Sequence, residues 1–274
     1  MFKFRFDSIS GGVEIYNRHW CFARSELINF LPLMKSPNYY SYQELYPELQ
    51  VLKDNLEVIQ DEARLMMEQP WIPWPEDHVG DGTSAETRDW TVFPFLHTFP
   101  ALDESKSKWI GSTSAMCPRT TELLRGIPNI RTALFSRLGS ATRLAPHTGW
   151  SDLANYVLRC HICLHMDDTP LDNYEEMIEQ ETRSENTTTT TSTMTGEMND
   201  KRGTCGMWVD GEVQFHSLGN IIVFDDSKRH KAFNYSTSER VVLIVDLLRP
   251  MAVGHGTAVG GHTEELNMLM ENFQ

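Results

Sequence analysis

The alternation of side chains between Val157 and His165 constrains the fold of this 274-residue chain more than any other feature. A β-strand places every second side chain on the same face, which puts Arg159 and His161 together with His165. The opposite face is apolar throughout: Leu158, Cys160, Ile162 and Leu164. Strand faces that meet water usually carry Lys, Glu, Thr or Ser, so an Arg and two His indicate an interior cavity that holds a charged ligand. A polar face turned toward water is the alternative.

A second strand of the same design follows near the end of the chain. Arg240 and Asp246 share one face of the segment 240–248, whose other face is apolar. Further short strand-like segments come after residues 48–67, where apolar side chains recur at helical spacing. This order predicts a mainly β fold with flanking helices, namely a double-stranded β-helix of the jelly-roll or cupin-like kind.

Composition narrows the class of protein. Hydrophobic residues make up 40% of the chain, which is enough for the core of one large domain. The formal net charge of −14 argues against nucleic-acid binding, because the phosphate backbone repels an acidic surface. Five scattered cysteines suggest free thiols in a reducing compartment. Since no apolar run approaches the ~18 residues of a membrane helix, we expect a cytoplasmic protein without a membrane partner. The sequence leaves its oligomeric state open.

Three parts can be separated along the chain. Residues 1–110 are predicted to form a helical and strand-containing flank packed on the core, and residues 111–250 the double-stranded β-helix itself. Within the core, residues 167–204 contain a Thr-rich run with almost nothing to bury, which indicates a flexible insertion. Residues 251–274 are predicted to be a C-terminal tail or helix.

Two histidines stand in turn-like contexts that suit metal binding. His147 lies in Pro-His-Thr-Gly and His230 ends Asp-Ser-Lys-Arg-His, 83 residues later (230 minus 147), so only the fold can bring them together. A lone histidine is usually structural or solvated, but Arg159, His161 and Arg240 on cavity-type faces make this pair better candidates for metal ligands. Imidazole suits iron, zinc, copper or nickel, and several open coordination positions fit iron and oxygen chemistry. The two arginines suit a small dicarboxylate.

Four segments carry a resemblance to a known family: FSRLGSATRLAPHTG, NYVLRCH, VFDDSKRH and ERVVLIVDLLRP. Pro-His-Thr-Gly is followed by Asn-x-x-x-Arg-x-His, then by Phe-Asp-Asp-Ser-x-x-His with an Arg ten residues later, and this combination is specific. The segments resemble the catalytic domain of the aspartyl/asparaginyl β-hydroxylase family, which consists of Fe(II)- and 2-oxoglutarate-dependent oxygenases on a double-stranded β-helix. The resemblance runs from about Leu49 to Pro250 and is interrupted by residues 167–204.

The resemblance assigns a role to each motif residue. The implied metal ligands are His147 and His230. The implied 2-oxoglutarate-binding residues are Ser136 and Arg240 at the distal carboxylate, and Arg159 and His161 beside the carboxylate and keto group that chelate the metal. The cofactors would be Fe(II), 2-oxoglutarate as co-substrate and O2. The implied reaction hydroxylates an unactivated C–H bond and releases succinate and CO2, with no catalytic side chain beyond the metal ligands.

One position departs from the common iron site of such enzymes. There a carboxylate stands two residues after the first histidine, where this chain has Gly149. The resembled family shares this gap, so water is expected at the open position. A chloride there would turn the enzyme into a halogenase, which is one alternative. A cupin-like metal-binding protein without catalytic activity is another, but such a barrel has no reason to place Arg240 ten residues after His230.

The substrate is less constrained than the cofactors. Family members that act on protein domains carry a membrane anchor and helical repeats, and neither pattern is found in this sequence, so we expect a small amino-acid-like or natural-product substrate. The predicted substrate-binding residues are Arg143, Trp150 and His165. Further candidates are Arg137, Asp152, Arg202 and His216. Asp225 and Asp226 are predicted to shape the turn that positions His230, or to support the metal site from behind its ligands.

Overall fold

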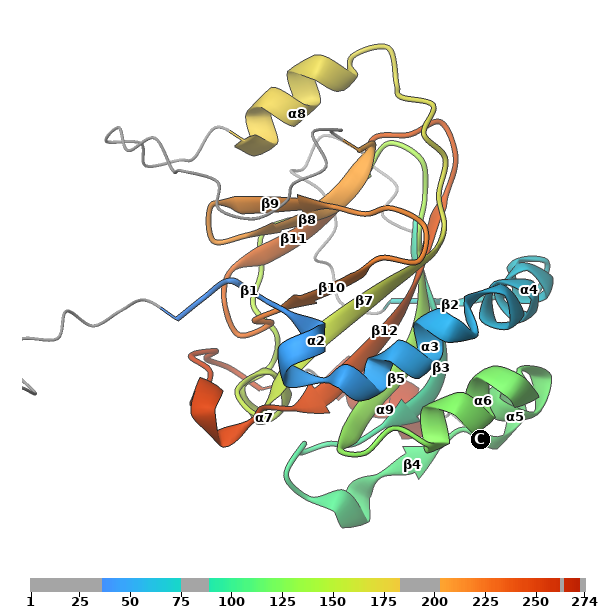
Figure 1. Ribbon diagram of the computed structural model, residues 1–274, viewed down its shortest axis with the longest axis vertical. Helices are drawn as coiled ribbons and strands as arrows, with labels where there is room; N and C mark the ends of the chain where they lie inside the picture. Colours follow the sequence, from blue (N-terminus) through green and yellow to red (C-terminus); the bar gives the residue numbers. More distant parts are fainter. Residues whose placement is uncertain (1–35, 75–88, 183–202, 262–263, 272–274) are drawn as a thin grey trace, which may run out of the picture. The chain divides into compact units, whose positions relative to one another are not determined.

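Two antiparallel β-sheets form the centre of the molecule (Figure 1). The computed structural model describes residues 36–74, 89–182, 203–261 and 264–271. The hairpin predicted within residues 1–24 lies outside these ranges.

The larger sheet holds both strands of alternating polarity side by side. In hydrogen-bonding order it contains β1 (Tyr39–Tyr40), β10 (Ile221–Phe224), β7 (Val157–His165), β12 (Arg240–Leu248), β5 (Ile130–Leu138), β3 (Trp90–His97) and β2 (Ile72–Pro73), while β4 (Lys108–Trp109) pairs with β3. The register sets Asp246 opposite Arg159, and Ile244 opposite His161. Although β3 comes from the predicted flank 1–110, it lies within this sheet beside β5.

The smaller sheet closes the other side of the barrel. Its order is β6 (Thr142–Arg143), β11 (His230–Asn234), β8 (Cys205–Val209) and β9 (Glu212–Phe215). Asp210 and Gly211 join β8 to β9 with φ values of 47° and 98°, so the predicted hairpin turn is confirmed. Apolar side chains of both sheets meet in one cluster: Leu138, Leu144, Met207, Val209, Ile222, Phe224 and Ala232. The predicted double-stranded β-helix is therefore confirmed.

Helices cover the outer face of the larger sheet (Figure 1). They are α2 (Tyr42–Leu45), η1 (Pro47–Leu49), α3 (Gln50–Asp54), α4 (Leu56–Met67), α5 (Gly111–Met116) and α6 (Pro118–Arg125). The apolar stripe predicted in residues 48–67 is buried against the strands: Leu49, Leu52, Ile59, Ala63 and Met66. Short elements elsewhere are η2 (Glu104–Lys106), α7 (Ser151–Ala154), η3 (Met251–Val253) and α9 (Glu264–Glu271). The apolar residues of β7 and β12 therefore pack against these helices, as their sequence pattern predicts.

One α-helix lies inside the predicted insertion 167–204. It is α8 (Tyr174–Thr182), which lies beyond the smaller sheet in Figure 1. Ile178 is fully buried in a cluster with Phe233 and Tyr235. Glu181 on the same helix accepts a hydrogen bond from the Tyr235 hydroxyl at 2.6 Å. This part of the insertion is therefore packed on the barrel; flexibility of the remainder stays a prediction, because residues 183–202 lie outside the described ranges.

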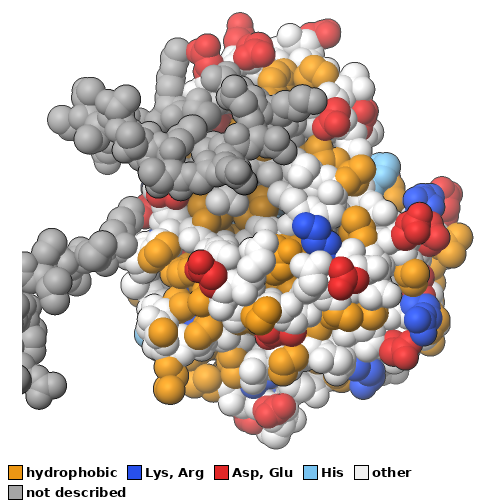
Figure 2. Space-filling view, in the orientation of Figure 1, with side chains coloured by type: hydrophobic (Ala, Val, Ile, Leu, Met, Phe, Trp, Pro, Cys, Tyr) orange, Lys and Arg blue, Asp and Glu red, His pale blue; other side chains and the backbone are white. Residues whose placement is uncertain are grey.

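The surface agrees with the acidic composition. On the face shown in Figure 2, acidic and apolar side chains are interspersed, and Lys and Arg lie at separate points. Within the described residues, no helix has the length and apolar character that crossing a membrane requires.

Candidate active site

The inner faces of β7 and β12 line a deep cavity between the two sheets. Arg159, His161, Arg240 and Ile244 contribute from these strands, and Ser136 from the neighbouring β5. The other lining residues are Trp90, Leu144, His147, Met207, Phe224, His230 and Ala232. The cavity measures about 340 Å³ together with the open space at its mouth. Arg159 and His161 of the polar strand face therefore line an interior cavity, as the sequence predicts, whereas His165 is exposed at the end of the strand.

The fold closes the gap of 83 residues (230 minus 147) between the two candidate metal ligands. His147 and His230 form an isolated antiparallel bridge, in which each backbone N–H donates to the carbonyl of the other, at 3.0 and 2.8 Å. Their ring centroids are 4.4 Å apart. The bridge continues the antiparallel pairing of β6 with β11 in the smaller sheet, which fixes the two histidines side by side.

Backbone carbonyls orient both imidazoles. Nδ1 of His147 lies 2.8 Å from the carbonyl oxygen of Ala145, and Nδ1 of His230 lies 2.9 Å from that of Lys228. A ring nitrogen facing a carbonyl carries the proton, which leaves the lone pair on Nε2. This is the tautomer that a metal-binding histidine adopts when its second nitrogen is fixed by a carbonyl. The pair can therefore present two Nε2 atoms to one ion.

Two buried carboxylates hold Arg159 in place. Its Nε and Nη2 donate to the two oxygens of Asp246 at 2.8 and 2.9 Å, and its Nη1 lies 2.7 Å from Asp226 Oδ1. Burial lowers the pKa of Arg159, but the two carboxylates outweigh that effect and raise it. Burial raises the pKa of Asp226 and Asp246, and the guanidinium opposes the rise in both. The guanidinium is thus fixed in orientation and charge at the edge of the cavity.

Asp226 fills the space that the missing side chain of Gly149 would occupy. A Cβ at Gly149 would clash with Oδ2 of Asp226 and lie 2.7 Å from the Cβ of Ala154. The backbone reinforces this approach, since the Gly149 N–H donates to the Asp226 carbonyl at 2.8 Å. Asp226 Oδ1 also lies 3.3 Å from Nε2 of His230. A carboxylate therefore does stand beside the two histidines, but it comes from another part of the chain.

A buried guanidinium at Arg240 suits a dicarboxylate co-substrate. Only 2% of Arg240 is exposed, and its Nε and Nη1 have no hydrogen-bond partner among the described residues. Burial lowers its pKa, which shows how unfavourable this position is for a charge without a counterion. Ser136 adds a hydroxyl that already accepts a hydrogen bond from Trp90 Nε1 at 3.0 Å. The unsatisfied donors fit a carboxylate entering the cavity.

His161 lies in the same cavity and packs against His216, which the sequence predicts only as a weaker substrate-binding candidate. Its ring is parallel to that of His216, with centroids 5.7 Å apart, and all four ring nitrogens lack partners within the described part of the chain. Burial lowers the pKa of both rings well below the usual value; His216 and Arg240 add to the effect at His161, and Arg240 adds to it at His216. Burial thus favours the neutral form of both rings, in which each offers one donor and one acceptor.

A second, outer cavity of about 460 Å³ adjoins the deep one and includes open solvent. The two share four lining residues: Trp90, His147, Arg159 and Ile244. The outer cavity adds Trp74, Val92, Leu134, Thr148, Gly149, Trp150 and Asp226. The histidine pair thus lies where the two cavities meet.

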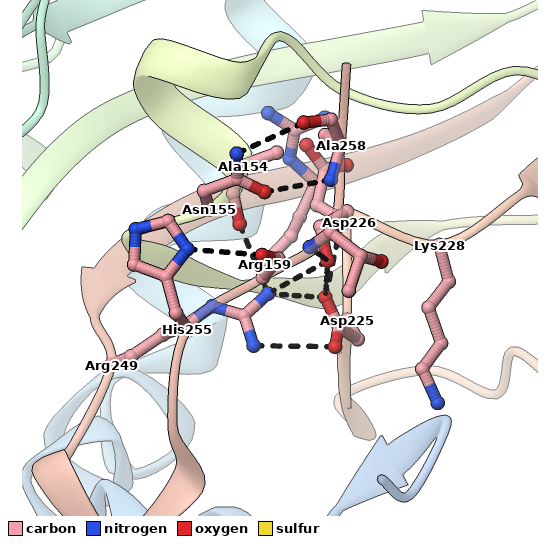
Figure 3. Close-up of polar contacts among 12 residues, drawn as sticks. Ala154, Asn155, Arg159, Asp225, Asp226, Lys228, Arg249, His255 and Ala258 are labelled. Atoms are coloured by element: carbon pink, nitrogen blue, oxygen red, sulfur yellow. Dashed lines mark hydrogen bonds and ion pairs between the residues drawn. The ribbon is translucent and has the colours of Figure 1, made fainter. Parts of the chain in front are cut away.

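The C-terminal segment fastens the turn that leads to His230 (Figure 3). Arg249 pairs with Asp225, whose Oδ1 also accepts from the Ser227 N–H at 3.0 Å. Asn155 exchanges two hydrogen bonds with the backbone of Ala258, at 2.7 and 3.0 Å. Asp225 therefore shapes the turn, as the sequence predicts, while its neighbour Asp226 faces the cavity.

The predicted substrate residues fall in different places. Trp150 lines the outer cavity. Arg143 lies 3.6 Å from the buried Glu181, and His165 is exposed at the end of β7; neither lines a cavity. Of the weaker candidates, Arg137 lies over Trp71 outside both cavities, His216 contacts His161, Asp152 is in α7, and Arg202 is outside the described residues. Their roles stay predictions.

Comparison with known proteins agrees with the family resemblance found in the sequence. Residues 53–250 match the family model described as Aspartyl/Asparaginyl beta-hydroxylase. An ornithine lipid ester-linked acyl 2-hydroxylase from Rhizobium tropici is 27% identical over 204 residues, which cover 74% of this chain and 57% of that protein. The chain thus spans less than two thirds of this curated relative's length.

Two solved structures are similar at lower levels. An oxidoreductase of the 2OG-Fe(II) oxygenase family from Burkholderia pseudomallei has 13% identity and a TM-score of 0.38, over 73% of this chain and 79% of that one. A prolyl-4-hydroxylase from Pseudomonas putida has 11% identity and a TM-score of 0.36, over 72% and 88%. The family match, in contrast, covers most of the chain, including both histidines and every polar residue of the deep cavity. The chain belongs to the aspartyl/asparaginyl β-hydroxylase family.

Proposed function

We propose that this protein is an Fe(II)- and 2-oxoglutarate-dependent hydroxylase that oxidises an unactivated C–H bond of a small amino-acid-like or natural-product substrate. The observation that carries the proposal is the deep cavity. It combines two imidazoles oriented for one ion with Arg240, a buried guanidinium whose Nε and Nη1 lack partners among the described residues. Bound iron would activate O2 as 2-oxoglutarate is oxidatively decarboxylated to succinate and CO2.

The residues of this chain divide the binding tasks. His147 and His230 would hold the metal through Nε2, since their Nδ1 atoms face backbone carbonyls. Arg240 and Ser136 would take the distal carboxylate of 2-oxoglutarate, and His161 would donate to its other end. Arg159 lines both cavities and keeps its orientation through Asp246, so it can hold a positive charge beside the co-substrate without moving. The apolar lining from both sheets excludes water.

The contact between Gly149 and Asp226 favours hydroxylation over halogenation. A halogenase needs room and a favourable potential for chloride beside the histidines. Here a buried carboxylate takes the space next to Gly149, and its negative charge opposes a second anion. The same carboxylate can accept a hydrogen bond from water, which suits a hydroxylase with two protein ligands.

The Rhizobium relative supports a small-molecule substrate built on an amino acid. Its name describes hydroxylation of an ester-linked acyl group of an ornithine lipid. An acylated amino acid belongs to the amino-acid-like class, so such compounds should be tested together with free amino acids and natural-product intermediates.

The test is turnover. Purified protein with Fe(II), 2-oxoglutarate and O2 should release succinate in a one-to-one ratio with hydroxylated product for at least one compound of such a panel, with and without chloride. His147→Ala should abolish succinate release. A chlorinated product in the chloride arm would replace hydroxylation by halogenation. The non-catalytic alternative predicts a different result. The protein would then bind metal tightly but release no succinate, either with any compound of the panel or slowly in the absence of substrate.

A further inference from the structure

The outer cavity has a wall of apolar side chains directly beside the candidate metal position. Its apolar lining consists of Trp74, Trp90, Val92, Leu134, Trp150 and Ile244. We propose that this cavity binds an uncharged, apolar group of the substrate, and that the oxidised carbon belongs to that group. This inference rests on the proposed function, because it assumes that oxidation takes place beside His147.

The three tryptophans are arranged as a wall. Trp74 stacks on Trp90 with centroids 5.1 Å apart and an interplanar angle of 26°. It stacks on Trp150 with centroids 5.8 Å apart and an angle of 18°. Sites that bind quaternary ammonium groups surround the cation with several aromatic faces. Here the three rings are stacked on one another, so they do not surround a cation; they add a largely apolar aromatic surface in which Trp74 Nε1 has no partner among the described residues.

The guanidinium that lines the outer cavity is already paired within the protein. Arg159 lies 2.7 Å from Asp226, the other charged residue of the lining. Its Nε and Nη2 donate to Asp246 behind the cavity. A substrate carboxylate would therefore lose its water beside the Asp226 carboxylate and a guanidinium that already has two partners, which is strongly unfavourable. An uncharged hydrocarbon meets no such cost, and it gains from contact with the tryptophans.

Continuity with the deep cavity places this group at the reacting centre. Trp90, His147, Arg159 and Ile244 line both cavities, so a group in the outer one ends next to the histidine pair. Polar parts of the substrate would remain at the solvent side. An alkyl chain and an aromatic ring share this chemistry, and free polar amino acids do not.

Binding probes can test the inference without turnover. Protein loaded with Fe(II) and 2-oxoglutarate in the absence of oxygen is titrated with methyl hexanoate (alkyl), methyl 3-phenylpropanoate (aryl), aspartate, ornithine and choline, and followed by tryptophan fluorescence and thermal shift. At least one of the two esters should saturate, and the one that does identifies the hydrocarbon. Trp74→Ala should weaken its binding about tenfold, from lost apolar contact. Trp74→Phe, which keeps a ring, should lose less.

The matched control is Trp109→Phe, since Trp109 lines neither cavity, and it should bind the ester as the wild type does. Saturation by aspartate, ornithine or choline in preference to both esters would overturn the inference. So would ester binding that is unchanged in Trp74→Ala and Trp150→Ala. Failure of the proposed function is a different result: the wild type would then show no visible absorption band from an Fe(II)–2-oxoglutarate complex, whatever the esters do.

Discussion

The deep and outer cavities share lining residues but differ in how their charged side chains are paired. In the deep cavity Arg240 is buried, and its Nε and Nη1 have no partner among the described residues, at a cost to stability. In the outer cavity Arg159 is paired with Asp226 and Asp246, and tryptophans form the wall. A protein that must bind a dianion keeps a buried charge available, whereas one that must admit hydrocarbon pairs its charges internally. This contrast separates co-substrate binding from substrate binding in one barrel.

The largest effect is expected at Arg240. Arg240→Met should weaken 2-oxoglutarate binding about 100-fold, because it removes charge-assisted hydrogen bonds to a carboxylate. Without 2-oxoglutarate, the variant should unfold at the same temperature as the wild type or a higher one, because a buried uncompensated charge is gone. Calorimetric titration and thermal unfolding measure the two quantities.

Arg137→Met is the matched control, since Arg137 lies over Trp71 outside both cavities. It should leave 2-oxoglutarate affinity unchanged. Wild-type affinity in Arg240→Met would show that the guanidinium does not hold the diacid.

A single methyl group added at Gly149, in the lining of the outer cavity, should lower the stability of the protein. Gly149→Ala should cost about 2 kcal/mol of unfolding free energy, because the new Cβ would clash with Asp226 and with Ala154 and both must shift. Gly111→Ala is the control, since a Cβ there meets nothing within 4 Å. Urea denaturation compares the two variants. Equal stability would mean that Asp226 does not occupy the space beside Gly149.

A smaller effect should appear in the acid dependence of stability. Burial holds the pKa of His216 well below its usual value, so the unfolded chain takes up a proton near pH 6.5 that the folded chain does not. Stability therefore falls as pH drops below that value, by up to about 1.4 kcal/mol per pH unit for this residue. His216→Phe should show a shallower decline between pH 6.5 and 5 in urea denaturation. An identical slope would mean that His216 is protonated in the folded state.

The smallest effect is expected on 2-oxoglutarate affinity when the outer cavity is altered. Trp74→Ala should change 2-oxoglutarate affinity by no more than about twofold, because Trp74 lines only the outer cavity and Trp90 keeps its hydrogen bond to Ser136. The same titration used for Arg240→Met measures it. A tenfold loss would show that the tryptophan wall also supports the deep cavity.

Strand periodicity allowed much of this site to be predicted from the sequence. A pleated strand has only two faces, and successive side chains alternate between them. In β7 and β12 this alternation places Arg159, His161 and Arg240 on one face and the apolar residues that pack under the helices on the other. The metal-ligand roles of His147 and His230 were implied by family resemblance, and the structure brings these residues together.

What the sequence could not show depends on contacts between distant loops. Trp74, Trp90 and Trp150 come from separate segments, and no local pattern indicates that they stack. The fit of Asp226 into the space beside Gly149 depends on backbone hydrogen bonds across the barrel. The docking of α8 likewise follows from Ile178 meeting Phe233 and Tyr235, which are some 55 residues away (233 minus 178).

The most direct test of the account is the visible spectrum of the protein with Fe(II) and 2-oxoglutarate under anaerobic conditions. The wild type and Trp74→Ala should show the absorption band of a metal-chelated 2-oxo acid. His147→Ala should lack it, and Arg240→Met should show it only at far higher 2-oxoglutarate concentrations. A wild type without the band, or a band that persists unchanged in His147→Ala and Arg240→Met, would contradict the assignment of the deep cavity.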